Sequence, residues 1–107
     1  MTILRVALAQ ANSTVGDLAG NERKAIEFIQ RAQQAGADLV LLPEMFLTGY
    51  PPEDLLLKPH FVSATMARLE SLARQVRGIT AIVGLAHYDG DLYNAAAFLH
   101  DGQVRGI

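Results

Sequence analysis

Two short apolar segments, separated by an amphipathic segment, constrain the fold of this chain most strongly. Residues 3–10 and 38–42 are nearly continuous runs of apolar side chains. Runs of this length are typical of strands that are covered on both faces. Between them, apolar residues recur at the spacing of one helical face, at Ala25, Phe28, Ile29 and Ala32. The order strand, helix, strand predicts an α/β architecture with a parallel sheet.

Capping residues predict where this first helix begins and ends. We expect Asn21 at the N-cap, with Asp17 as the earlier alternative, because such side chains accept hydrogen bonds from the free amides of the first turn. Gly36 is expected to end the helix, since glycine adopts the left-handed conformation at little cost. Pro43 then stops the second strand.

The second half of the chain predicts one more helix and two more strands. The helix begins near Pro59, ends before Gly78 and buries a stripe of Val62, Met66, Leu69, Ala73 and Val76. Residues 79–85 are rich in β-branched side chains and predict a third strand. A turn at residues 89–91 leads into a fourth strand at residues 92–99. The predicted order is therefore β-α-β-α-β-β.

The end of the sequence follows directly on a hairpin turn. Asp101 and Gly102 form the turn, and only five residues remain for the returning strand. We therefore expect Met1 to be a natural start and Ile107 to be a cut within a larger domain. A sheet left unfinished in this way is expected to expose unpaired strand edges.

Composition excludes several classes of protein. Of the 107 residues, 50% are hydrophobic, which excludes an intrinsically disordered chain. The net charge of -2 provides no electrostatic footprint for nucleic acid or for an anionic membrane. The chain has no cysteine, and therefore no thiolate nucleophile or disulfide of its own. No apolar run has the length of a membrane span. We expect a soluble, cytoplasmic protein.

Glu44 is the first candidate for chemistry, because it lies two residues beyond the second apolar run. In open α/β sheets, the active crevice lies beyond the carboxyl ends of the strands. A carboxylate there is expected to be partly desolvated, which raises its proton affinity and suits a general base. The alternative is an exposed loop glutamate or a cap for the next turn. Tyr50 either lines a pocket with its ring and hydroxyl or packs on the neighbouring prolines.

Other polar residues are weaker candidates. Glu53 and Asp54 either bind a cation or stabilise the N-terminus of a helix. Asn94 interrupts an apolar strand, and we expect it to satisfy backbone groups near a turn rather than to bind a ligand. No metal site is expected among the histidines, which lack ligand spacing: His60, His87 and His100. The glycines form no phosphate-binding pattern.

The segment around Glu44 resembles a known family. Residues 41–44, Leu-Leu-Pro-Glu, resemble the glutamate segment of the nitrilase, or carbon–nitrogen hydrolase, superfamily. Residues 47–57, Leu-Thr-Gly-Tyr-Pro-Pro-Glu-Asp-Leu-Leu-Leu, are similar to the glutaminase domain of bacterial glutamine-dependent NAD synthetases. Shorter segments match in the same order, at residues 5–10, 15–17, 83–84, 92–94 and 101–102. The resemblance therefore covers nearly the whole chain.

This resemblance implies a fold and a reaction. The fold is a four-layer α-β-β-α sandwich, incomplete here, which often pairs through its helices, so a homo-oligomer is expected. A Glu-Lys-Cys triad hydrolyses glutamine: the cysteine attacks the amide, ammonia leaves, and water releases glutamate. Glu44 matches the general base, and Tyr50 matches a position that lines the glutamine pocket. A synthetase domain, with ATP and Mg, then uses the ammonia to amidate deamido-NAD.

The chain departs from this family pattern at two triad positions. The family lysine and cysteine lie downstream of the segment equivalent to Gly106 and Ile107, and neither Lys24 nor Lys58 matches the lysine. We therefore expect residues 1–107 to be an N-terminal fragment of a glutaminase domain, without the synthetase domain, without a cofactor and inactive alone. The alternatives are a fragment of another amidase of the superfamily, or a non-catalytic α/β binding or assembly module that is a stable monomer.

Overall fold

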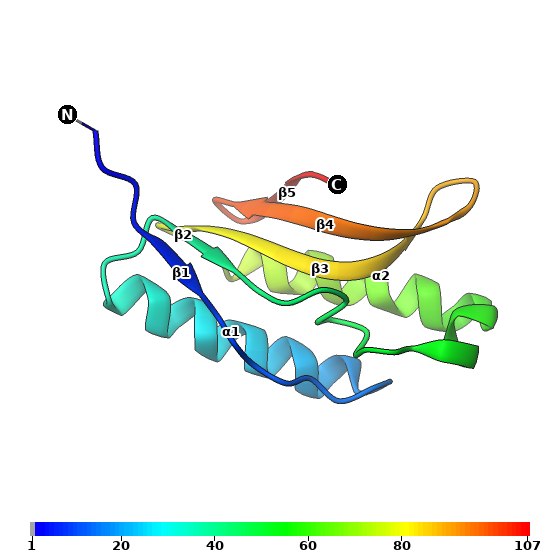
Figure 1. The fold of residues 1–107 in the computed structure, drawn as a ribbon. Helices are drawn as coiled ribbons and strands as arrows, with labels where there is room; N and C mark the ends of the chain where they lie inside the picture. The colour runs from blue at the N-terminus through cyan, green and yellow to red at the C-terminus, as the bar shows by residue number, and fades with distance from the viewer. Residues whose placement is uncertain (1) are drawn as a thin grey trace.

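A single mixed sheet carries two helices on one of its faces (Figure 1). The computed structural model describes residues 2–107. The strands lie in the sheet in the same order as in the sequence: β1 (Val6–Leu8), β2 (Leu39–Leu41), β3 (Thr80–Tyr88), β4 (Leu92–His100) and β5 (Gln103–Gly106). The first three strands are parallel to one another, and the last two add as antiparallel neighbours. The predicted α/β architecture is confirmed, and the sheet is parallel in its first three strands and antiparallel beyond them.

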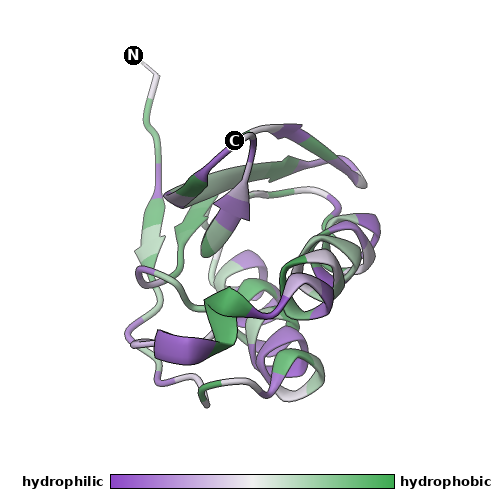
Figure 2. Cartoon of the chain, turned by 90° about the vertical axis from the view of Figure 1, so that its right-hand side faces the viewer, coloured by the Kyte–Doolittle hydropathy of each residue, from purple (hydrophilic) through white to green (hydrophobic). Residues whose placement is uncertain are grey.

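Both helices pack on the same side of the sheet, as Figure 2 shows. They are α1 (Leu18–Gln34) and α2 (Pro59–Arg74), and a short 3-10 helix, η1 (Glu53–Leu57), precedes α2. The core lies between the helices and the sheet, and its fully buried members include Ala25, Val40, Leu69, Leu72, Val83, Leu85 and Leu99. Burial of these apolar side chains is the main term that stabilises the two layers against each other.

A buried carboxylate joins the two helices. Glu22 on α1 forms an ion pair with Arg68 on α2, with 3.0 Å between the guanidinium nitrogen and the carboxylate oxygen. The hydroxyl of Ser71 and the side-chain amide of Gln75 also donate to Glu22, at 2.6 and 3.2 Å. These partners satisfy the carboxylate, which burial would otherwise destabilise.

The face of the sheet turned away from the helices carries no helix within residues 2–107. Side chains alternate between the faces of a strand, and Ala7 packs toward the core while Val6 and Leu8 are 46% and 68% exposed. Phe98, between two fully buried neighbours on β4, is 47% exposed. The expectation that residues 3–10 are covered on both faces is therefore wrong for the described part of the chain, because both helices lie on one side.

The structure corrects several predicted boundaries. Asp17, the earlier alternative, is the N-cap of α1, and its carboxylate accepts a hydrogen bond from the Gly20 amide at 3.0 Å. Gly36 follows the helix with a φ of 84°, as predicted for its C-terminal end. Strand β3 continues to Tyr88, beyond the predicted residue 85, because it pairs with β4 along its whole length.

The loop after β2 crosses over β3 at Gly84. The Leu47 amide donates to the Gly84 carbonyl at 3.0 Å. A Cβ atom at position 84 would lie 2.5 Å from both the Met45 nitrogen and the Pro43 oxygen, which are backbone atoms. The missing side chain therefore lets the backbone that carries Glu44 lie directly on β3.

We predict that Gly84→Ala destabilises the chain by about 1–3 kcal/mol, because the added methyl group displaces packed backbone. The matched control is Gly106→Ala, since a Cβ atom there meets nothing within 4 Å. Urea unfolding of both variants, followed by circular dichroism, measures the change in the free energy of unfolding. Equal costs at the two positions would contradict this account of the crossing.

Candidate functional site

Glu44 lies on the loop that leaves the carboxyl end of β2, at the edge where the sequence places it. Buried residues that follow the exposed glutamate anchor this loop. Phe46 and Leu47 are buried in the core, and the Phe46 amide donates to the Pro43 carbonyl at 3.2 Å in a tight turn. The side chain of Glu44 is exposed, so the expected desolvation is wrong for the described residues.

Asn21 joins the loop between β1 and α1 to the loop that carries Glu44. Its side chain is fully buried, and its amide group donates to the Thr14 carbonyl at 2.8 Å and to the Leu47 carbonyl at 3.0 Å. Its carbonyl oxygen accepts a hydrogen bond from the Thr14 amide at 2.8 Å. Asn21 is therefore not the N-cap of α1, as first expected, but a bridge between α1 and both loops.

The same two loops also touch through their backbones. The Gly16 amide donates to the Thr48 carbonyl at 3.0 Å. Gly49 has a φ of 84°, and a Cβ atom there would lie 2.4 Å from the Cα atom of Val15. Glycine at position 49 thus provides both the left-handed conformation and the space for this contact.

Two hollows flank Glu44. The first, of about 280 Å³, is lined by Ala11, Asn12, Ser13, Pro43, Glu44 and Tyr50. The second, of about 320 Å³, is lined by Leu42, Pro43, Glu44, Ile82, Gly84, Asn94, Ala95 and Ala96. The structure thus brings Tyr50, which is 64% exposed, to the same hollow as Glu44. A role of Tyr50 in lining a pocket requires this position beside the hollow.

Asn94 contacts Glu44 directly. Its side-chain amide donates to the Oε1 atom of Glu44 at 3.0 Å, although 50 positions separate the two residues. Asn94 lies on β4 opposite Ala86 of β3. The expectation that Asn94 satisfies backbone groups near a turn is therefore wrong. The one signal for this contact in the sequence is that Asn94 is a polar residue within an apolar run. The partner is not indicated, because the contact joins elements that are far apart in the sequence.

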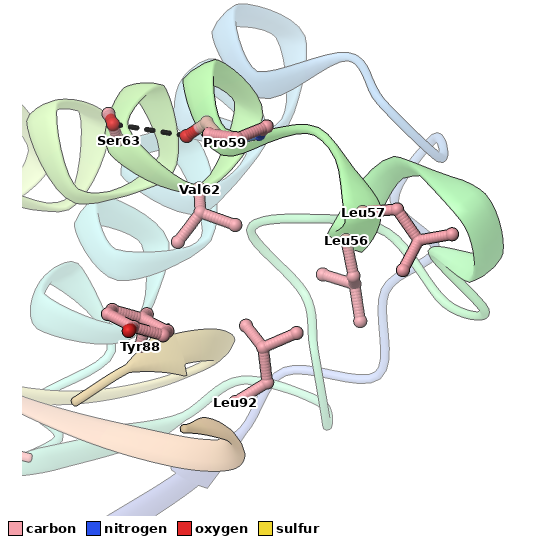
Figure 3. Close-up of a pocket in the computed structure, with 7 residues that line it drawn as sticks. All are labelled: Leu56, Leu57, Pro59, Val62, Ser63, Tyr88 and Leu92. Carbon is pink, nitrogen blue, oxygen red and sulfur yellow. Dashed lines mark hydrogen bonds between the residues drawn. The ribbon is translucent and has the colours of Figure 1, made fainter. Parts of the chain in front are cut away.

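The largest of the hollows described here, of about 480 Å³, lies elsewhere and is apolar (Figure 3). It shares no residue with those at Glu44, and its lining consists of Leu56, Leu57, Pro59, Val62, Ser63, Tyr88 and Leu92. The Ser63 hydroxyl donates to the Pro59 carbonyl at 3.1 Å, as the dashed line in Figure 3 marks. No charged side chain lines this hollow.

The remaining candidates lie outside the two hollows at Glu44. Glu53 and Asp54 form the first turn of η1, as the helix interpretation predicted. Lys24 donates to the backbone oxygen of Asn12 at 3.3 Å and so supports the first loop. Across residues 2–107, no group of three or more histidine, cysteine, aspartate or glutamate residues is placed to hold a metal ion. No helix in that range is long and apolar enough to cross a membrane.

The site as it stands holds a proton acceptor without a strong nucleophile. Glu44 presents a carboxylate that one amide orients, and Tyr50 adds a phenol beside it. Among the residues that line the two hollows, Ser13 has the only aliphatic hydroxyl, and it forms no hydrogen bond to Glu44. The arrangement is able to accept a proton from a group that enters either hollow.

Comparison with known proteins places this site in a family. The carbon–nitrogen hydrolase family matches residues 5–107. The glutamine-dependent NAD(+) synthetase of Thermotoga maritima is 46% identical over 109 residues, which cover 100% of this chain and 19% of that protein. This chain therefore spans about a fifth of the length of that relative.

Solved structures agree with the sequence comparison. A glutamine-dependent NAD(+) synthetase from Cytophaga hutchinsonii superposes with a TM-score of 0.90 at 29% identity, over 96% of this chain and 18% of the other. An amidase from Nesterenkonia sp. AN1, with acrylamide added at its active site cysteine, superposes with a TM-score of 0.78 at 27% identity, over 97% and 42%. The two likenesses cover 96% and 97% of this chain. This chain belongs to the carbon–nitrogen hydrolase family.

Proposed function

We propose that residues 1–107 form the first part of a glutaminase domain in a glutamine-dependent NAD synthetase. The observation that carries this proposal is the position of Glu44 at the end of β2. All of this chain matches the Thermotoga maritima synthetase, although it covers only 19% of that protein. Tyr50, in the same hollow, is proposed to line the pocket for glutamine. ATP and Mg²⁺ would act in a separate synthetase domain that amidates deamido-NAD.

In the proposed reaction, Glu44 is the general base. Its carboxylate accepts the proton of a cysteine thiol that another part of the protein supplies, and the thiolate attacks the side-chain amide carbon of glutamine. Glu44 returns this proton to the amide nitrogen, and the tetrahedral intermediate releases ammonia and leaves a thioester. Water then cleaves the thioester to give glutamate and the free thiol. A lysine outside this chain would stabilise the negative charge that develops on the amide oxygen.

The uncovered face of the sheet fits this assignment. Val6, Leu8 and Phe98 expose apolar side chains that a second sheet would bury in a four-layer sandwich. The same surface, together with the unpaired outer edges of β1 and β5, counts against a stand-alone module with a closed sheet.

Another amide is the second candidate substrate. The fold likeness to the Nesterenkonia amidase, with a TM-score of 0.78, favours a carbon–nitrogen hydrolase without a synthetase domain. A protein of this second kind would hydrolyse small aliphatic amides faster than glutamine and would make no NAD. The identity of 46% to a synthetase gives the first candidate the stronger support.

We predict that the purified 107-residue chain releases no ammonia from glutamine, because it has no cysteine to form the thioester. Ammonia release is measured with a coupled glutamate dehydrogenase assay. Turnover that the substitution Glu44→Gln removes would contradict the requirement for an outside nucleophile.

A chimera tests the role of Glu44 in a complete enzyme. In it, this chain replaces the matching segment of the Thermotoga maritima synthetase. We predict that Glu44→Gln lowers glutamine-driven NAD synthesis by about 10²–10⁴-fold, the usual contribution of a general base. Ammonia-driven synthesis should persist, because it bypasses the glutaminase step.

The matched control for this experiment is Glu53→Gln, which neutralises an acid on η1 that lines neither hollow at Glu44. The control should retain both activities. Equal loss of glutamine-driven and ammonia-driven synthesis in the Glu44→Gln chimera would count against the glutaminase assignment. A chimera that makes NAD from ammonia but never from glutamine, even with Glu44 present, would also contradict it.

A further inference from the structure

We propose that Asn94 is a positioning residue for Glu44, whose amide holds one carboxylate oxygen and leaves the other oxygen free to receive the proton. The inference rests on the proposed function of Glu44 as the base. It assigns a role to a residue on β4, far in sequence from the loop that carries the glutamate.

The geometry fixes which oxygen is held. The Nδ2 atom of Asn94 lies 3.0 Å from the Oε1 atom of Glu44, within the range of a normal hydrogen bond. Among residues 2–107, this is the only hydrogen bond to the Glu44 carboxylate. The Oε2 atom therefore has no partner in the described part of the chain and is the oxygen available to an entering group.

The loop of Glu44 and the strand of Asn94 both contact the same strand, β3. The backbone of Glu44 lies on β3 at Gly84, where a side chain would collide with it. Asn94 faces Ala86 of β3 in the antiparallel register with β4. Because positions 84 and 86 of one strand support the two backbones, the distance between the amide and the carboxylate depends on a rigid element rather than on a flexible loop.

The residue type suits this role. A neutral amide donor stabilises the ionised form of the carboxylate and adds no charge that would compete for the proton. The hollow on this side of Glu44, of about 320 Å³, is lined in part by the small residues Gly84, Ala95 and Ala96. Asn94 donates to no backbone group among residues 2–107, which separates it from a purely structural amide such as Asn21.

The test uses the same chimera and two variants. Asn94→Ala removes the donor, and we expect kcat of the glutaminase reaction to fall about 10- to 100-fold, the cost of a misplaced catalytic group. The KM for glutamine should stay within about twofold, because positioning of the base acts on the chemical step.

Asn94→Asp replaces the donor with a second negative charge beside Glu44. The acidic limb of the rate–pH profile should then move to higher pH, since like charges disfavour ionisation.

Within residues 2–107, Tyr50 is the one other titratable side chain that lines the two hollows. The cysteine and the lysine that the synthetase supplies also titrate, but they are the same in every chimera, so the shift is measured as the difference between Asn94→Asp and the parent chimera. The matched control is Tyr93→Ala, which truncates the exposed neighbour on β4 and lines neither hollow. It should retain kcat, KM and the pH profile. Ammonia-driven synthesis and the thermal melting temperature, measured for every variant, report on folding.

Several results would overturn the inference. An unchanged kcat in Asn94→Ala, or an unmoved acidic limb in Asn94→Asp, would exclude a positioning role. A raised KM with unchanged kcat would instead assign Asn94 to substrate binding. If Glu44→Gln abolishes the glutaminase reaction while the Asn94 variants behave like the parent chimera, only this inference fails. Full glutaminase activity in Glu44→Gln would mean that the proposed function itself fails.

Discussion

The contact of the Glu44 loop with β3 is the constraint on which the site depends. At Gly84 the sheet presents no side chain, so the backbone of Pro43 and Met45 lies directly on the strand. This contact sets the height of Glu44 above the sheet and brings its carboxylate within 3.0 Å of the Asn94 amide. One of the two hollows at Glu44, the one that Gly84 lines, lies at this crossing. A glycine that catalyses nothing therefore determines where the candidate base is held.

The sequence predicted the elements of the fold well, because each one depends on local patterns. Apolar runs located the strands, helical spacing located α1 and α2, and Pro59 marked the first residue of α2. The position of Glu44 beyond β2 followed from the same reasoning. The prediction that residues 3–10 are covered on both faces was wrong for the described residues. An apolar run indicates that a strand is buried, but it does not indicate which elements bury it.

The supports of the site were not predictable from local patterns. Asn21 and Asn94 were interpreted through nearby backbone, as a helix cap and as a turn residue. Their partners lie far along the chain, since Asn21 binds Leu47 and Asn94 binds Glu44. Such contacts exist only after the strands have paired and the loops have crossed. A lone polar residue in an apolar strand is therefore better treated as a possible partner for a functional side chain than as a local exception.

The central claim is that Glu44 activates a thiol toward the amide of glutamine. The most direct test is to mix the chimera with glutamine, quench the reaction within the first turnover and search for a glutamyl thioester on cysteine by mass spectrometry. The account predicts that the adduct forms when Glu44 is present and is absent in the Glu44→Gln chimera, although both chimeras still make NAD from ammonia. A glutamyl thioester that forms equally fast in both would contradict it.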